Sequence, residues 1–163
     1  MDYKKILSNF AVVLLIFFTD RFSKIYILKL AELDSKVDIY LTPFLNFYLI
    51  WNKGIAFGLF SINDEIVYNF LTIIISIIIF IILIMLIRSR GFQRYSLLMV
   101  FGGSLGNLYD RIYFSAVPDF IDFHIGSFHW FIFNVADIFI TMGVICLIYA
   151  EIFLNKEENE KFN

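Results

Sequence analysis

The sequence predicts an all-α membrane protein with four transmembrane helices, and two observations support this fold class. First, 60% of the 163 residues are hydrophobic, whereas a soluble domain has about 45–50% apolar residues. Second, four apolar runs of roughly 20 residues are each long enough, as helices, to cross a hydrocarbon core of about 30 Å. Inside lipid these runs must be helical, because backbone groups find no water to bond. The expected spans are residues 7–30, 66–87, 95–114 and 131–154.

The first span follows Lys4 and Lys5, as a signal peptide would, but it leads into Thr19-Asp20-Arg21 without a small-residue cleavage site. We therefore interpret it as a retained helix. The second span has no charge and is rich in Ile, so we expect it to face lipid. The third contains Gly102 and Gly106, a GxxxG pattern that favours close helix packing.

Cations indicate the orientation of the four spans. They precede the first span, fill the short link between the second and third, and follow the fourth: Lys4, Lys5, Arg88, Arg90, Arg94, Lys156 and Lys161. The positive-inside rule therefore predicts that both termini are cytoplasmic. We expect one integral membrane domain, residues 1–163, that is a monomer.

The long connection between the first two spans, about residues 31–65, is rich in aromatic residues in "PFLNFYLIWNKGIAFGLF", Pro43 to Phe60. Such residues suit short strands, with Asn52-Lys53-Gly54 as a tight turn between two of them. They equally suit an aromatic belt that anchors the loop at the lipid headgroups. Composition does not choose between these interpretations.

Polar residues within the spans gather toward the non-cytoplasmic side, although a charge at the bilayer centre costs about 2.5–3.5 kcal/mol. They form three pairs at helical spacing: Asp20 with Lys24, Asn107 with Arg111, and Asn134 with Asp137. The first pair can neutralise itself. Asp137 has no cation on its own helix, so it needs a partner from elsewhere or a proton.

A partner for Asp137 is available just before the fourth span, in "AVPDFIDF", which carries Asp119 and Asp122. Two carboxylates in one low-dielectric site share a proton, and the pKa of one of them rises. One can then take a proton from water while the other donates to a carbonyl oxygen, which is aspartyl peptidase chemistry. Spacing alone leaves Asp119 and Asp122 equally suitable.

Several other classes of function are disfavoured. The net charge of -2 argues against nucleic acid binding. His124 and His129 lack helical i,i+4 spacing and no HExxH is present, so we expect interfacial histidines and no metal or cofactor. A small transporter or proton channel is the main alternative, since it too uses intramembrane carboxylates. A non-catalytic assembly protein, held by its GxxxG face, is a third hypothesis.

Five sequence blocks, in order along nearly the whole chain, resemble the lipoprotein signal peptidase family, also called signal peptidase II. They are "DRFSK" from Asp20, "NKGIAFGLF" from Asn52, "GGSLGNLYDR" from Gly102, "VPDFIDF" from Val117 and "FNVAD" from Phe133. One departure is Pro118, where the family often has a second Val. Each block is weak by itself, but five in order are specific.

The resemblance implies an intramembrane aspartyl endopeptidase of the bacterial cytoplasmic (inner) membrane. Such an enzyme removes the signal peptide of a prolipoprotein that carries a diacylglyceryl-Cys, and it cleaves just before that Cys near the outer leaflet. By motif position, the catalytic pair is Asp119 and Asp137. The other matching positions bind substrate or support the site: Asp20, Lys24, Asn52, Gly54, Asn107, Arg111 and Asn134. The resemblance also implies a small extracytoplasmic β-cradle in the loop between helices 1 and 2.

Overall fold

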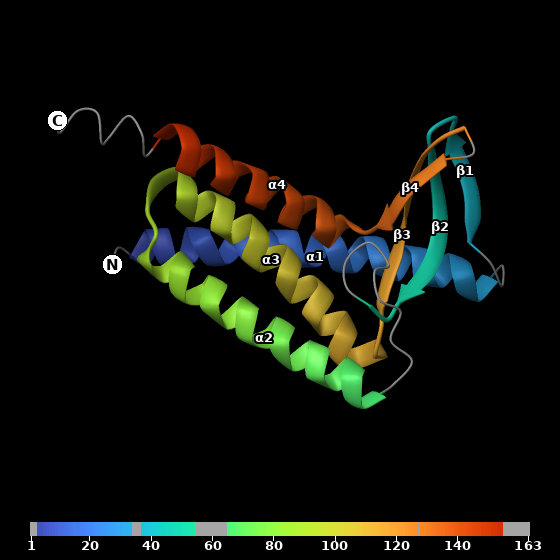
Figure 1. Ribbon diagram of the computed structural model, residues 1–163, viewed down its shortest axis with the longest axis horizontal. Coiled ribbons are helices and arrows are strands. Elements are labelled where there is room, and N and C mark those ends of the chain that lie inside the picture. Colours follow the sequence, from blue (N-terminus) through green and yellow to red (C-terminus); the bar gives the residue numbers. More distant parts are fainter. Residues whose placement is uncertain (1–2, 34–36, 55–64, 127, 155–163) are drawn as a thin grey trace.

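A computed structural model describes residues 3–33, 37–54, 65–126 and 128–154. Over these residues the chain forms a bundle of helices with a small sheet at one end (Figure 1). The helices are α1 (Tyr3–Leu33), α2 (Glu65–Arg88), α3 (Gly91–Phe114) and α4 (Val135–Tyr149), and a short π-helical segment, Ala150–Leu154, continues α4. The predicted helical segments thus correspond to helices in the structure, with one exception at the start of α4.

Two of these helices are long and apolar enough to cross a membrane by themselves. They are Glu65–Arg88 and Val135–Phe153. The other two, α1 and α3, carry buried charged residues, including Asp20, Lys24 and Asp110. The fold is therefore helical, with two candidate membrane spans and a small antiparallel sheet. A total of four spans remains a prediction.

The start of the fourth predicted segment is wrong as a helix. Residues 131–133 belong to strand β4 (Phe128–Phe133), and α4 begins only at Val135. Asn134 is the N-cap: its side chain accepts a hydrogen bond from the Asp137 backbone N–H, and the Asp137 side chain accepts one from the Asn134 N–H. This capping box sets the helix start. A short apolar run does not by itself distinguish strand from helix, which explains the error.

The sheet has four antiparallel strands in the order β1 (Asp38–Thr42), β2 (Leu45–Asn52), β3 (Val117–Ile125) and β4. Two strands come from the α1–α2 connection and two from the α3–α4 connection. The expected cradle in the first loop therefore accounts for only half of the sheet. The tight turn joins β1 to β2 at residues 43–44, and β2 ends at Asn52. Any strand after Asn52-Lys53-Gly54 would lie outside the described residues.

Glycines allow α3 to lie very close to its neighbours. A Cβ atom on Gly102 would be 3.0 Å from the Ile16 side chain of α1, and one on Gly103 would be 2.6 Å from the Ala136 backbone oxygen of α4. A Cβ on Gly106 would be 2.6 Å from a carboxylate oxygen of Asp20. This confirms the packing role predicted for the GxxxG pattern, and it brings the polar residues of α1, α3 and α4 together.

The sheet is held against the second half of α1 by a small apolar cluster. The cluster contains three buried residues: Ile27 of α1, Phe120 of β3, and Val37, which precedes β1. Phe47 of β2 packs on them. The rings of Phe47 and Phe120 meet edge to face with centroids 5.8 Å apart. Phe120 immediately follows Asp119, so this packing fixes the strand position of that carboxyl.

Candidate active site

Asp119 lies on β3 and is buried, with 1% of its surface exposed. Its two carboxyl oxygens accept hydrogen bonds from two amides: Oδ2 from Asn52 Nδ2 at 2.9 Å, and Oδ1 from Asn134 Nδ2 at 2.6 Å. Asn52 is oriented by its own Oδ1, which accepts from the Gly54 backbone N–H at 2.8 Å. Both oxygens of Asp119 are therefore held by neutral donors.

Asp137 lies in the first turn of α4, where the unpaired N–H groups of the helix favour a carboxylate. Its Oδ1 accepts a hydrogen bond from Asn107 Nδ2 at 2.9 Å, and its Oδ2 accepts from the Asn134 backbone N–H at 3.2 Å. The carboxyl thus lies between α3 and the cap of its own helix.

Asn134 connects the two carboxyls. Its side-chain amide donates to Asp119, while its side-chain oxygen accepts from the Asp137 backbone N–H at 3.1 Å. The side chain of Asn134 is completely buried. One asparagine therefore hydrogen-bonds both the strand-borne carboxyl and the first turn of the helix that carries the other.

Asp122, which spacing left as an equal alternative to Asp119, contacts a different set of residues. Its carboxylate lies 2.8 Å from Nδ1 of His129. Because side chains alternate along a strand, residues three apart point to opposite faces. Asp119 and Asp122 are therefore separated by the strand itself, and Asp119 shares the asparagine with Asp137.

Burial raises the pKa of Asp119 from its ordinary value of 3.8 to about 7, and the nearby negative charge of Asp137 contributes to the rise. The hydrogen bonds from Asn52 and Asn134 oppose the shift, since they favour the ionised form. Asp119 therefore keeps a proton well above the pH at which an exposed carboxyl loses it. A carboxyl in that state can donate a proton as a general acid.

A buried ionic cluster adjoins Asn107, the residue that hydrogen-bonds Asp137. Lys24 Nζ donates to Asp20 at 2.8 Å, to Asp110 at 2.7 Å and to Asn107 Oδ1 at 2.8 Å. Because Lys24 binds the oxygen of Asn107, the amide nitrogen of Asn107 is turned toward Asp137. The interpretation of Asp20 and Lys24 as a self-neutralising pair was therefore incomplete.

Two members of this cluster were missed by the sequence analysis. Arg21 lies 2.6 Å from Asp110, and both side chains are buried. Asp110 follows Asn107 by three residues on α3, so helical spacing places both on one face, a signal available in the sequence. Asp20 in addition accepts a hydrogen bond from the Ala136 backbone N–H at 3.0 Å, which ties α1 to the first turn of α4.

Arg111 joins α3 to the backbone that follows β2. Its Nη2 donates to the Gly54 carbonyl oxygen at 2.7 Å, and its guanidinium carbon lies 5.9 Å from the ring centroid of Tyr68 on α2. Its Nη1 is buried and has no hydrogen-bond partner among the described residues. Nη2 of the guanidinium is thus held by Gly54, while Nη1 can donate to another acceptor.

An apolar pocket of about 380 Å³ opens beside Asp137. Its walls come from β4 and α4, including Trp130, Phe131, Phe133 and Met142. A pocket of this size and character suits apolar groups, with Asp137 as a polar group at its edge. The arrangement as a whole places an acid, a second carboxyl and an apolar binding surface together.

Comparisons with known proteins agree on one family. A family model described as "Signal peptidase (SPase) II" matches residues 12–153. The "Lipoprotein signal peptidase" of Pelagibacter ubique (strain HTCC1062) is 56% identical over 162 residues, which cover 99% of this chain and 98% of the relative. The protein of the same name from Anaplasma phagocytophilum (strain HZ) is 39% identical and covers 91% of this chain and 94% of the relative.

A solved structure, titled "Bacterial membrane enzyme structure by the in meso method at 2.3 A resolution", has the same fold. It aligns with a TM-score of 0.70 and 29% identity, over 94% of this chain and 91% of the solved one. The match is thus of sequence, of length and of fold, and it includes all five blocks on which the resemblance was based. The chain therefore belongs to the signal peptidase II family.

Proposed function

We propose that this chain is an intramembrane aspartyl endopeptidase that cleaves diacylglyceryl-modified prolipoproteins just before the lipidated Cys. Its family of aspartic-type lipoprotein signal peptidases cleaves signal peptides from prolipoproteins. The observation that carries the proposal for the site is the bridge formed by Asn134, which hydrogen-bonds Asp119 and the first turn of α4 at Asp137. The transporter alternative receives no support from these relatives.

In the proposed mechanism, Asp119 and Asp137 enter the reaction with one shared proton. The ionised carboxyl takes a proton from a water molecule, whose oxygen bonds to the scissile carbonyl carbon, while the protonated carboxyl donates its proton to the carbonyl oxygen. The resulting diol collapses: the C–N bond breaks, the leaving nitrogen receives the proton taken from water, and a hydroxyl of the diol returns its proton to the carboxyl that had donated one, which restores the pair. The raised pKa of Asp119, about 7, supports a pair that still holds one proton near neutral pH.

The remaining residues would hold the substrate or the pair. Asn52, Asn107 and Asn134 keep the two carboxyls in place, and Asp20 and Lys24 keep Asn107 oriented. We assign Nη1 of Arg111, which is unpaired among the described residues, to a substrate carbonyl or to a polar part of the lipid-modified peptide. The apolar pocket beside Asp137 would take apolar groups that flank the scissile bond.

The proposed membrane arrangement has four spans in a single domain and cytoplasmic termini. The described termini lie at the end of the bundle opposite the sheet (Figure 1). Lys5, Arg88, Arg90 and Arg94 line one cavity there, which supports a cytoplasmic position for that end. The sheet and the carboxyl pair then lie near the outer leaflet, where water reaches the peptide bond while the lipid chains stay in the bilayer.

The test is cleavage by the purified protein in detergent. A prolipoprotein carrying diacylglyceryl-Cys should be cut at a single bond, immediately before that Cys. The matched control is the same prolipoprotein without the lipid, which should be cut far more slowly. If neither form is cleaved by folded protein, the peptidase proposal is wrong; if both are cleaved equally, the lipid is not recognised.

A further inference from the structure

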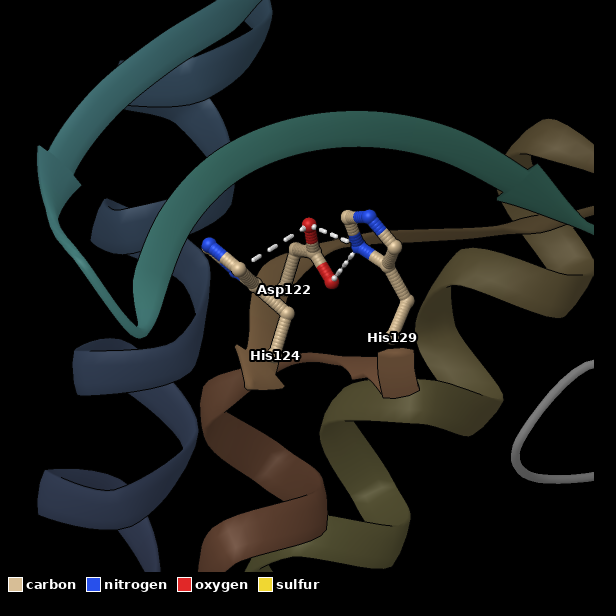
Figure 2. Close-up of side chains that lie close together, drawn as sticks. All are labelled: Asp122, His124 and His129. Atoms are coloured by element: carbon tan, nitrogen blue, oxygen red, sulfur yellow. Dashed lines mark hydrogen bonds and ion pairs between the residues drawn. The ribbon is translucent and has the colours of Figure 1, made fainter. Parts of the chain in front are cut away.

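A second group of titratable side chains lies on the β3–β4 hairpin, on the strand face opposite Asp119. It consists of Asp122 and His124 of β3 and His129 of β4 (Figure 2). Asp122 and His124 are two residues apart and point to the same side, and His124 pairs with His129 across the strand ladder. Each residue offers one ligand atom, and the three atoms lie within 4.8 Å of one another.

The contacts within this group are incomplete. His129 Nδ1 is 2.8 Å from Oδ2 of Asp122, whereas His124 Nδ1 is 3.8 Å from the same oxygen, too far for a hydrogen bond. The His124 side chain is 8% exposed, and its Nδ1 has no hydrogen-bond partner among the described residues. A buried polar nitrogen left without a partner is costly, so its position calls for an explanation.

A further unpaired acceptor faces the same region. Asn46 of β2 is the direct partner of Asp122 across the β2–β3 ladder. Directly opposed residues in a sheet share a face. The Asn46 side-chain oxygen is buried and, among the described residues, accepts no hydrogen bond. Two buried polar atoms on neighbouring strands, Nδ1 of His124 and Oδ1 of Asn46, thus lack a described hydrogen bond, and both residues neighbour Asp122.

We propose that Asp122, His124 and His129 bind a divalent transition-metal cation, for which Zn²⁺ is the best match. Tetrahedral Zn²⁺, with bonds of about 2.0–2.2 Å to N and O ligands, holds its ligand atoms roughly 3.3–3.5 Å apart. The two observed separations from the Asp122 oxygen, 2.8 and 3.8 Å, lie on either side of that range. Two imidazoles and one carboxylate form a ligand set typical of zinc.

Access to the site is open. The His129 side chain is 55% exposed, so an ion can enter from the solvent side and keep water as its remaining ligand. The expectation of no metal was based on helical i,i+4 spacing, which does not apply because these residues are on strands. The pairing of His124 with His129 across the hairpin brings together two ligands that helical spacing would not.

The bound ion would tie β3 to β4. The hairpin has a register irregularity between Phe123 and His124, where pairing is weakened. Asp119 lies on the same strand, three residues before Asp122. A metal bridge at this point would therefore hold the strand that carries Asp119 without contacting that carboxyl itself.

The test uses full-length protein with Cys146→Ala, to remove the only thiol, purified in detergent and freed of metal with a chelator that is then removed. Titration with Co²⁺ should produce visible d–d absorption that saturates at one ion per chain, and Zn²⁺ should displace it. His124→Ala and His129→Ala should each weaken binding by more than the about 10–100-fold typical of losing an outer-shell partner. Asp38→Ala, which removes an exposed carboxylate of β1, should bind normally.

Two further variants keep the proposal falsifiable if the alanine variants fold poorly. His129→Cys supplies a thiolate and should add a sulfur-to-cobalt charge-transfer band, which only direct ligation produces. Asp119→Asn should retain Co²⁺ binding, which separates this site from the carboxyl pair. Absence of saturable binding, binding that survives both alanine substitutions, or a folded His129→Cys protein without the charge-transfer band would each overturn the proposal.

Discussion

Among the described residues, the side chains that donate hydrogen bonds to Asp119 and Asp137 are all asparagine amides. They belong to Asn52, Asn107 and Asn134. A neutral amide that orients a carboxyl favours the ionised form less than a cation at the same place would. The nearest cation is one contact farther away: Lys24 hydrogen-bonds Asn107, which in turn hydrogen-bonds Asp137. This separation suits a carboxyl pair that keeps a proton.

The first prediction concerns the carboxyl pair. Asp119→Asn and Asp137→Asn should each lower kcat/KM by at least about 10³-fold, because neither amide can exchange the proton that the reaction moves. Both variants should insert and fold, since Asn has the shape of Asp. Asp38→Asn, at an exposed carboxylate of the sheet, is the control and should cleave normally. Turnover near the wild-type rate in either of the first two variants would remove that residue from the catalytic pair.

The second prediction is a pH dependence. The pKa of Asp119 in the folded protein, about 7, is above its ordinary value of 3.8, so the folded state binds this proton more tightly than the unfolded state. Its contribution to stability is therefore complete below about pH 4 and is lost as the pH rises through about 7. The acid form is lost in the same window, so kcat/KM should decline above about pH 7. A profile that stays flat through that region would contradict a role for the Asp119 proton in the reaction.

The third prediction tests whether Arg111 anchors the protein at the headgroups or holds groups in the site. Arg111→Lys keeps the charge and the ability to reach the interface, but a lysine cannot donate to Gly54 and to a second acceptor in the same planar geometry. We expect kcat/KM to fall by about tenfold or more, which corresponds to about 1.4 kcal/mol of transition-state stabilisation. Unchanged cleavage by folded Arg111→Lys protein would assign the residue to anchoring.

At the scale of elements, α3 determines how closely the parts of the site approach. Gly102 and Gly106 face α1, while Gly103 faces the start of α4. With a larger residue at these positions the Lys24 cluster and the Asn107–Asp137 hydrogen bond would be stretched. The site therefore requires the small residues of α3, although none of them touches a carboxyl of the proposed catalytic pair.

The fourth prediction follows from this packing. A Cβ on Gly103 would lie 2.6 Å from the Ala136 backbone oxygen, which a side-chain rotation cannot relieve. Gly103→Ala should therefore destabilise the protein by about 1–3 kcal/mol, the usual cost of overpacking, and should lower activity by moving α4. Thermal unfolding in detergent measures the first effect and cleavage the second. Ser104→Ala, the neighbouring position on α3, should have little effect on either; equal stability of the two variants would contradict the packing argument.

The elements differ in how far the sequence predicts them. Helices are predicted well, because their length and apolar character are local properties, and the five blocks supply the residues proposed for the site. The pairing of β2 with β3 was missed, since it depends on residues far apart in sequence, such as Asn52 with Val117. The β3–β4 hairpin is local, and it was missed because the apolar end of β4 was assigned to the fourth span. The same error hid the group formed by Asp122, His124 and His129. The role of Asp110 was available from helical spacing and was overlooked.

At the scale of the whole molecule, the two ends of the bundle differ in character. One end carries the described termini and a cavity lined by Lys5, Arg88, Arg90 and Arg94. The other carries the sheet, whose exposed side chains are largely aromatic, such as Tyr40, Trp51 and Trp130. Aromatic residues are common at membrane interfaces, so the sheet end suits contact with headgroups as well as substrate.

The fifth prediction tests the orientation in whole cells, in a Cys146→Ala background. A cysteine at Gln93, in the end that carries the cations, should react with an impermeant thiol reagent only after the cells are permeabilised. One at Tyr40, whose side chain is 67% exposed on β1, should react in intact cells. The reversed pattern would place the sheet in the cytoplasm and contradict the proposed topology.

The ionic cluster between α1 and α3 has a consequence for how the protein enters the membrane. Together the buried residues Asp20, Arg21 and Lys24 of α1 carry one excess positive charge, and among the described residues Asp110 is the carboxylate from another helix that pairs with them. Asp110 lies 86 residues after Lys24 and is synthesised much later. An unpaired ammonium group is costly in hydrocarbon, so α1 should wait with its charged segment near water until α3 arrives. We expect the two helices to settle into the bilayer as a pair, which makes biogenesis a step that depends on α3 even though α1 emerges first.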